Sequence, residues 1–192
     1  FSGPKPIFHH LGEDHSRDKG IPGADGIVHA ASRFSAAEDG HGIGIADING
    51  DGKADVLTPY GWFENIDANR DRWKWHSDWN LGDAGFPIIG YDVNNDGKMD
   101  IIYGQGHRYG LYWLEQQGTG SDRHWIRHFI DESYSQIHAL KLVDIDGDGQ
   151  PELLTGKRYR GHSGHDPGSY DPLVVYYYKI DRKTAQFTRY AI

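Results

Sequence analysis

The sequence predicts an all-β protein built from repeated four-stranded units, of the kind found in β-propellers. Two observations support this prediction. The 192 residues include 26 glycines, 12 tyrosines and no cysteine, a composition typical of many short strands joined by tight turns. A short acidic segment also recurs, beginning at Asp47, Asp92 and Asp144, at intervals of roughly 50 residues, as expected for propeller blades.

Four strand-like segments align around each acidic segment. In the first unit, residues 42–46 lead into the acidic segment and residues 56–58 leave it, which predicts a β-hairpin. The third strands are predicted at residues 62–64, 111–114 and 173–178, and the fourth strands at residues 73–76, 124–130 and 187–192. Residues 1–192 therefore form a single propeller region whose blades are expected at residues 40–82, 85–131 and 134–192.

The N-terminal segment resembles the end of a blade. Residues 6–11 are similar to the fourth strand at residues 125–130, and no first three strands precede them. We expect residues 1–11 to be the outer strand of a preceding blade, whose remaining strands come from the same longer chain or from another subunit. The alternative is a flexible arm. Residues 12–39 show no strand pattern and are predicted to form a loop.

The acidic segments predict calcium sites. Calcium takes roughly six to eight oxygen ligands, which alternate residues of a tight loop can supply at positions one, three and five. The glycine at position six permits a sharp turn, the carbonyl at position seven is the expected main-chain ligand, and the residue at position nine closes the site. The predicted ligands are Asp47, Asn49, Asp51, Lys53 and Asp55; Asp92, Asn94, Asp96, Lys98 and Asp100; and Asp144, Asp146, Asp148, Gln150 and Glu152. We expect about three structural Ca²⁺ ions.

The acidic segments have two other interpretations. An EF-hand requires Glu at position twelve, where this chain has Thr58, Tyr103 and Thr155, so that interpretation fails. Ordinary acidic turns remain an alternative, but their clustered carboxylates would repel one another without a cation.

The net charge of −8 leaves no broad basic face for nucleic acid, and no apolar run is long enough for a membrane span.

The acidic loops resemble those of the FG-GAP or VCBS-repeat calcium-binding β-propellers, from about residue 39 onward. Residues 41–47, 75–82, 109–115 and 155–159 are also similar to bacterial proteins that resemble the propeller part of aldos-2-ulose dehydratase, which removes water from oxidised sugars. The resemblance implies a ring of about seven blades and secretion. An extracellular or periplasmic location is expected, because millimolar calcium there would fill such loops.

Candidate catalytic residues are expected at the opposite end of the hairpins. His41, Phe86 and His138 begin the first strands, so they would line one mouth of a propeller channel. Residues that follow the second strands would gather there too, namely Tyr60, His107, Tyr109, Lys157, Arg158 and Tyr159. A histidine base with Lys or Arg beside a developing enolate would suit a keto sugar. The candidates are His41, His138, His107, Lys157 and Arg158; strand capping by His41 and His138 is the alternative.

Other polar and aromatic residues have less specific interpretations. His162, His165 and Asp166 in residues 161–168 suggest a second metal site, although loop hydrogen bonding is favoured. Trp62 and Tyr109 are the aromatic residues considered for stacking on a sugar. Three functions remain open: a calcium-binding module with a binding or assembly surface for carbohydrate, a lyase or dehydratase of oxidised keto sugars, and a subunit of an extracellular assembly.

Overall fold

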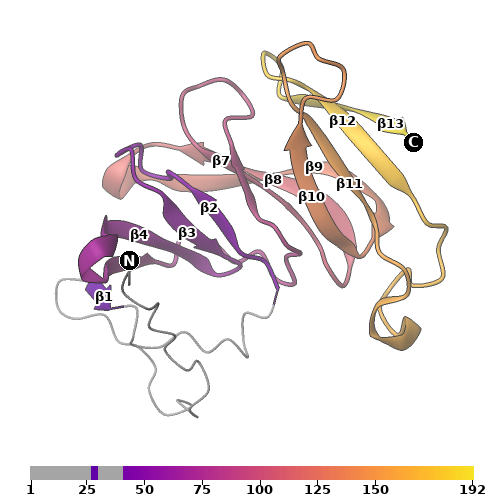
Figure 1. Ribbon diagram of the computed structural model, residues 1–192, viewed down its shortest axis with the longest axis horizontal. Coiled ribbons are helices and arrows are strands. Elements are labelled where there is room, and N and C mark those ends of the chain that lie inside the picture. Colours follow the sequence, from indigo (N-terminus) through magenta and orange to yellow (C-terminus); the bar gives the residue numbers. More distant parts are fainter. Residues whose placement is uncertain (1–26, 30–40) are drawn as a thin grey trace, which may run out of the picture.

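The structure, a computed structural model, describes residues 27–29 and 41–192. Their strands form antiparallel sheets that follow one another along the chain and stand side by side (Figure 1). The first sheet contains β1 (Ile27–His29), β2 (Gly44–Ala46), β3 (Asp55–Thr58), β4 (Gly61–Asp67) and β5 (Arg72–His76). The second contains β6 (Ile89–Tyr91), β7 (Asp100–Gly104), β8 (Tyr109–Gln117) and β9 (His124–Ser135). The third contains β10 (Ile137–Val143), β11 (Glu152–Lys157), β12 (Val175–Asp181) and β13 (Gln186–Ala191).

The predicted all-β fold with four-stranded units is confirmed. In each unit the strands pair in chain order, and the acidic segment joins the first strand to the second. This arrangement is consistent with propeller blades. The remaining regular elements in the described ranges are short 3₁₀ turns at Ala68–Arg70, Gly120–Asp122 and Gly161–Gly164.

The structure differs from the sequence prediction in β1 and in the length of β9. A short strand, β1, pairs antiparallel with β5, so the loop predicted for residues 12–39 is wrong at Ile27–His29. These three residues are too few to produce a strand pattern, and the pairing partner lies far along the chain. β9 extends to Ser135, beyond the predicted end at residue 130. The outer strand predicted within residues 1–11 lies outside the described residues.

The first and second sheets meet at β2 and β6, and the second and third sheets meet at β7, β8 and β10. Glycine allows the backbones to approach at both contacts. A Cβ added to Gly44 in β2 would overlap the carbonyl oxygen of Ile88, and the Ile88 N–H donates to the Ile43 carbonyl at 2.9 Å. A Cβ on Gly104, at the end of β7, would overlap the side chain of Ile137 in the third sheet. Glycine at these positions therefore fixes the spacing between blades.

The second sheet is buried on both faces. Ile101 and Ile102 are adjacent in β7 and fully buried, and they belong to the two different hydrophobic cores on either side of the sheet. This is the alternation expected of a strand. Trp62 is also fully buried (0% exposed), so it cannot stack on a sugar, and that interpretation is wrong. Its large apolar ring is used in the core between the first and second sheets instead.

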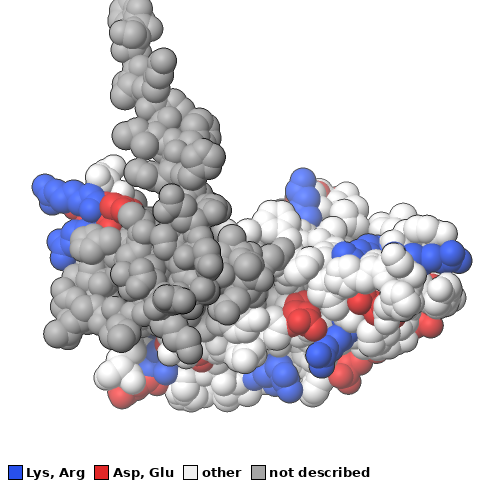
Figure 2. All heavy atoms as spheres, turned by 90° about the horizontal axis from the view of Figure 1, so that it is seen from below, with Lys and Arg blue, Asp and Glu red and all other residues white. Residues whose placement is uncertain are grey.

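The charges are mixed rather than segregated on the face seen in Figure 2, where Lys and Arg lie among Asp and Glu on the described part. Within that part of the chain, no helix is long and apolar enough to cross a membrane.

Candidate functional site

The acidic loops lie at one end of the three sheets, the upper side in Figure 1. In the first loop, the carboxylate of Asp47 accepts hydrogen bonds from the N–H groups of Gly50 and Gly52, both at 2.8 Å. Asp144 does the same in the third loop, with Gly147 at 2.7 Å and Gly149 at 3.0 Å. The first carboxylate of these loops thus folds the chain around itself, which brings the other oxygens close to it.

The ninth-position carboxylates fasten the loops to the sheets. Asp100 is fully buried, and it accepts hydrogen bonds from the N–H groups of Val93 (2.9 Å) and Gln116 (2.8 Å). Asp55 makes the corresponding pair of bonds, both at 2.9 Å. Burial raises the pKa of both carboxyl groups, that of Asp100 to about 6, although the N–H donors oppose the shift. These residues are therefore anchors of the hairpin as well as predicted ligands.

The fit to calcium is clearest in the third loop. Carboxylate oxygens of Asp144, Asp146 and Glu152 lie within 4.8 Å of one another. Such oxygens are the ligands that a hard cation prefers. Lysine side chains also contact the loop carboxylates: Lys53 Nζ lies 3.0 Å from Asp51, and Lys98 Nζ lies 2.6 Å from Asp96. The acidic loops thus gather carboxylate oxygens of the kind that a hard cation prefers, and these carboxylates pair with lysine ammonium groups.

The third position of each loop contacts the third strand of its own sheet, and the partner changes with the residue. Asn49 donates to Glu64 at 3.2 Å, and Asn94 donates to Glu115 at 3.4 Å. In the third loop the position is Asp146, and its partner is the ammonium group of Lys179. In the first two sheets an amide donor thus meets a carboxylate, and in the third sheet a carboxylate meets an ammonium group.

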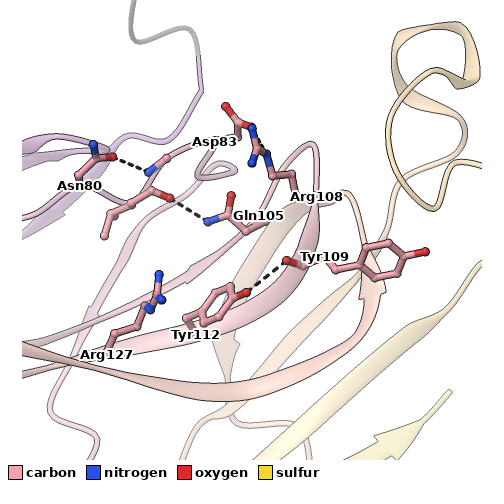
Figure 3. Close-up of a pocket in the computed structure, with 9 residues that line it drawn as sticks. Asn80, Asp83, Gln105, Arg108, Tyr109, Tyr112 and Arg127 are labelled. Carbon is pink, nitrogen blue, oxygen red and sulfur yellow. Dashed lines mark hydrogen bonds and ion pairs between the residues drawn. The ribbon is translucent and has the colours of Figure 1, made fainter.

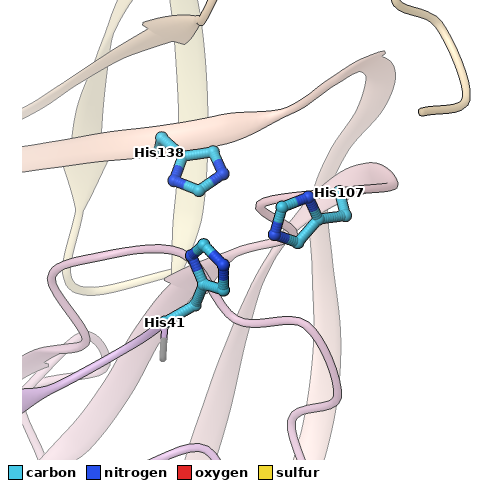
Figure 4. Close-up of side chains that lie close together, drawn as sticks. All are labelled: His41, His107 and His138. Carbon is cyan, nitrogen blue, oxygen red and sulfur yellow. The ribbon is translucent and has the colours of Figure 1, made fainter. Parts of the chain in front are cut away.

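Three histidines meet at the other end of the sheets (Figure 4). His41 precedes β2, His107 lies in the β7–β8 loop and His138 is in β10. Their ring centroids are 4.4 Å apart for His41 and His107 and 5.2 Å apart for the other two pairs. One ring nitrogen from each histidine lies within 4.8 Å of those of the others. The hairpins of three successive blades thus place one imidazole each at a common point.

Asp166 holds one of these histidines, His107, in place. Its carboxylate contacts His107 Nδ1 at 3.0 Å, His162 Nδ1 at 3.0 Å and the Arg158 guanidinium at 3.1 Å. Although burial alone would raise it, these three hydrogen bonds lower the pKa of Asp166 to about 2. His162 also stacks on His107, with ring centroids 4.3 Å apart. Asp166 is therefore an anion that holds the Nδ1 edge of the His107 ring, and His162 covers one face of that ring.

The electrostatics at this point favour the neutral forms of His138 and His41. Burial, followed by the positive charges of Arg158, His107 and His41, lowers the pKa of His138 to about 4. Burial also lowers the pKa of His41, with His107 and Arg158 adding to the effect. At neutral pH, His138 is therefore a base or a ligand rather than a cation.

The structure brings together four of the five candidate catalytic residues, namely His41, His107, His138 and Arg158. Lys157 lies apart: it is buried, and its Nζ donates to the carbonyl of Ser169 at 3.3 Å. Phe86, at the position equivalent to the two histidines, is 55% exposed and is followed by a cis peptide bond to Pro87. The side chain of His165 is not part of the His107–His162–Asp166 group. The link between Asp166 and His107 spans 59 residues, so no local pattern could reveal it.

A polar pocket of about 350 Å³ lies beside the β7–β8 loop (Figure 3). Tyr112 donates from its hydroxyl to the carbonyl of Tyr109 at 3.3 Å, and Arg127 lies over the Tyr112 ring at 5.5 Å. The guanidinium of Arg108 pairs with Asp83 at 3.0 Å. The lining residues are Asn80, Leu81, Gly82, Asp83, Gln105, Arg108, Tyr109, Tyr112 and Arg127. Tyr109 is the one candidate site residue among them that the sequence indicates, because the lining residues come from separate segments with no common motif.

The fold and the acidic loops define a class of protein: an all-β chain of four-stranded blades with one acidic hairpin loop in each. Residues 92–155 match the FG-GAP-like repeat family. The match begins at the first residue of the second acidic loop and includes the whole third acidic loop. The resemblance seen in the sequence is thus confirmed for these residues. No curated protein matches the chain.

Proposed function

We propose that the chain is a calcium-binding module of an extracellular or periplasmic β-propeller that presents a carbohydrate-binding surface. The observation that supports calcium most directly is the repeated carboxylate geometry of the loops, above all the convergence of Asp144, Asp146 and Glu152. FG-GAP-like repeats often bind calcium. The ion would be held by the side-chain oxygens at positions one, three, five and nine, and it would neutralise carboxylates that otherwise repel one another.

A thermal melt with and without a calcium chelator, paired with a calcium titration, tests this proposal. We expect about three ions per chain and a clearly higher Tm with calcium, because an ion that binds only the folded state stabilises it. Asp144→Asn should remove one ion, whereas Asp122→Asn, at an exposed position outside the loops, should remove none. An unchanged Tm together with no calcium binding would contradict the proposal.

The polar pocket supports the carbohydrate part of the proposal. A sugar presents hydroxyl groups and apolar C–H faces, and the pocket offers Asp83, Gln105 and Arg108 together with the rings of Tyr109 and Tyr112. Binding of neutral and oxidised sugars, followed by NMR, should shift signals from these residues. Tyr109→Ala should weaken that binding several-fold, and the exposed Tyr190→Ala, on β13, should leave it unchanged. Equal binding by both variants would place any sugar site elsewhere.

A second candidate function is a lyase or dehydratase of oxidised keto sugars, similar to the aldos-2-ulose dehydratase group. The neutral His138 beside His41 and Arg158 supports it, because a base and a cation near one carbonyl are what enolate chemistry requires. Purified protein would be assayed for loss of water from a 2-keto sugar. Replacing both His41 and His138 by Ala should abolish turnover and leave carbohydrate binding largely intact. Absence of turnover in the wild-type protein would exclude this candidate for the sugars tested.

We also propose that β2 packs against a further blade, from the same longer chain or from another subunit. Ile43 and Ile45 flank the buried Gly44, and they are 51% and 71% exposed. Since alternate residues of a strand face opposite sides, this apolar side is left for another packing partner. Native mass spectrometry would detect a subunit assembly. A stable monomer whose melting is unaffected by Ile45→Lys would contradict this arrangement.

A further inference from the structure

The asparagine at position three of the first two acidic loops is held at both ends of its amide group. In the first loop, Asn49 Nδ2 donates to Glu64 Oε1 at 3.2 Å, and Asn49 Oδ1 accepts from the N–H of Asp51 at 3.1 Å. In the second loop, Asn94 makes the corresponding pair of bonds, with Glu115 at 3.4 Å and with a loop N–H at 3.1 Å. The amide nitrogen thus faces the third strand of the sheet, and the amide oxygen faces the loop.

The glutamate carboxylate decides which end of the amide faces the loop. An asparagine amide has a donor end and an acceptor end of nearly the same shape, so it can turn over unless its neighbours differ. A carboxylate accepts hydrogen bonds and does not donate them, so it binds the NH₂ end. The oxygen end is left for the loop, and calcium takes oxygen ligands. Glu64 and Glu115 therefore determine whether the third position can supply a ligand.

Each of these carboxylates is itself fixed by the core of its sheet. His76 Nε2 lies 2.7 Å from Glu64 Oε2, and the His76 ring stacks on Trp62 with ring centroids 4.2 Å apart. Trp62 is fully buried. In the second sheet, His128 lies 2.8 Å from the equivalent carboxylate and stacks on the buried Trp113 at 4.4 Å. A chain of contacts from tryptophan to histidine to glutamate thus holds an acceptor at a set place beside each loop.

The third sheet shows what changes when position three is an aspartate. By strand register, the stacked pair Tyr177 and Tyr190 takes the place of the tryptophan and the histidine. Lys179, two residues after Tyr177, takes the place of the glutamate and pairs with the carboxylate of Asp146. Either oxygen of an aspartate can serve as a ligand, so no acceptor is needed to orient it, and a glutamate would repel it. The third-strand residue thus matches the third loop position in each of the three sheets.

We propose that Glu64 and Glu115 are positioning residues of the first two calcium loops. Each turns the amide of its asparagine so that the oxygen is available to the ion, although neither glutamate is a predicted ligand. This inference rests on the proposed calcium binding, and it adds a dependence of affinity on the third strand. The competing explanation is charge alone, in which a nearby carboxylate attracts calcium whatever the orientation of the amide.

Glu64→Asp separates orientation from charge. It keeps the negative charge, but its shorter side chain cannot reach Asn49. Calcium affinity of the first loop, followed by NMR at the N–H of Gly52, should fall by about 10–100-fold, the usual effect of losing an outer partner of a metal ligand. The second loop, followed at the N–H of Gly97, should bind as in the wild type. The control Glu132→Asp, at an exposed position outside the loops, should leave both affinities unchanged.

The same change in a second background tests the role of the amide. Asn49→Asp supplies an oxygen in either orientation, so adding Glu64→Asp to it should lower the calcium affinity of the first loop by less than threefold. Charge alone predicts that Glu64→Asp has little effect in either background. Equal losses in the two backgrounds would show a general disturbance of the sheet. Either of these results, with normal binding by the wild type, would overturn the positioning role alone.

A measurement on the wild-type protein covers the case in which a variant fails to fold. In chelator, the side-chain NH₂ groups of Asn49 and Asn94 should exchange with solvent much more slowly than that of the exposed Asn80, because a carboxylate holds them. Exchange as fast as that of Asn80 would overturn the positioning role. Absence of calcium binding by the wild type would instead overturn the calcium proposal, and this inference with it.

Discussion

Gln116 in the second sheet donates from its side-chain amide to the main-chain carbonyl of Ile48, inside the first acidic loop, at 3.1 Å. The same amide donates to the Met99 carbonyl at 2.8 Å, and Gln116 is only 3% exposed. Arg182 of the third sheet makes a similar link: it donates to the Asp92 carbonyl at 2.8 Å and pairs with the Asp92 carboxylate at 2.9 Å. Each of the first two acidic loops is thus bound to the following blade. The conformation of these loops therefore affects the interface between blades.

The first prediction concerns Gln116. Gln116→Leu removes both donated bonds and leaves the buried carbonyls of Ile48 and Met99 without that partner, so we expect a loss of about 2–4 kcal/mol in the free energy of unfolding. Urea denaturation in calcium and in chelator would measure it. Gln186→Leu, at an exposed position, should change stability by less than about 0.5 kcal/mol. Equal stability of both variants would show that the link to the first loop contributes little.

The second prediction concerns competition between a lysine and calcium. Lys179 pairs with Asp146, a predicted ligand of the third loop, so calcium binding there must displace the ammonium group or share the carboxylate with it. Lys179→Met should therefore raise the calcium affinity of the third loop several-fold. Isothermal titration would detect this as one tighter site. Lys183→Met removes the same charge in the turn that follows β12. It should have little effect, because the Lys183 side chain is exposed. A lower affinity in Lys179→Met would mean that Lys179 positions Asp146 rather than competing for it.

The sequence was sufficient for the parts of the fold that depend on local pattern. The acidic segments and the alternating aromatic strands follow from neighbouring residues, so the hairpins and the order of strands were predictable. The histidine group was only partly predictable from the sequence. The blade repeat placed His41 and His138 at equivalent positions, but the turn of the β7–β8 loop decides that His107 joins them while Arg108 and Tyr109 line a different pocket. The role of Asp166 depends on the long connection between β11 and β12, whose path has no repeat equivalent.

The third prediction concerns pH. The pKa of His138 is lowered to about 4 in the folded chain from 6.5, so the unfolded chain binds this proton more readily. The stability contributed by neutral His138 is therefore present above about pH 6.5 and is lost as the pH falls towards 4. Asp100 acts in the opposite direction: its raised pKa of about 6 means that its contribution is lost as the pH rises from 3.8 through 6. The two effects overlap in the wild-type protein.

A variant separates these two contributions. In chelator, the Tm of the wild type relative to His138→Gln should decrease between pH 7 and pH 4.5, because only the wild-type chain takes up a proton at this ring when it unfolds. The corresponding difference for Asp100→Asn should change in the opposite direction over the same range. A Tm difference between wild type and His138→Gln that does not vary with pH would show that the ring titrates alike in the folded and unfolded chain.

The last prediction concerns the contact between the first two blades. Gly44 faces the backbone of Ile88, where even a methyl group would overlap the carbonyl oxygen, and a backbone atom cannot move aside as the end of a side chain can. Gly44→Ala should therefore force β2 away from β6 and lower the free energy of unfolding by more than about 2 kcal/mol.

The matched control is Gly82→Ala. The added Cβ would meet only the Gln105 side chain, at 3.9 Å, so the cost is that of a positive φ (+65°), about 1–2 kcal/mol. Urea denaturation of the two variants compares them directly, and hydrogen exchange should show the extra loss for Gly44→Ala at the Ile88 N–H, which bonds to the Ile43 carbonyl across the interface. If Gly44→Ala were no less stable than Gly82→Ala, the close contact between Gly44 and Ile88 would not determine the packing of the first two blades.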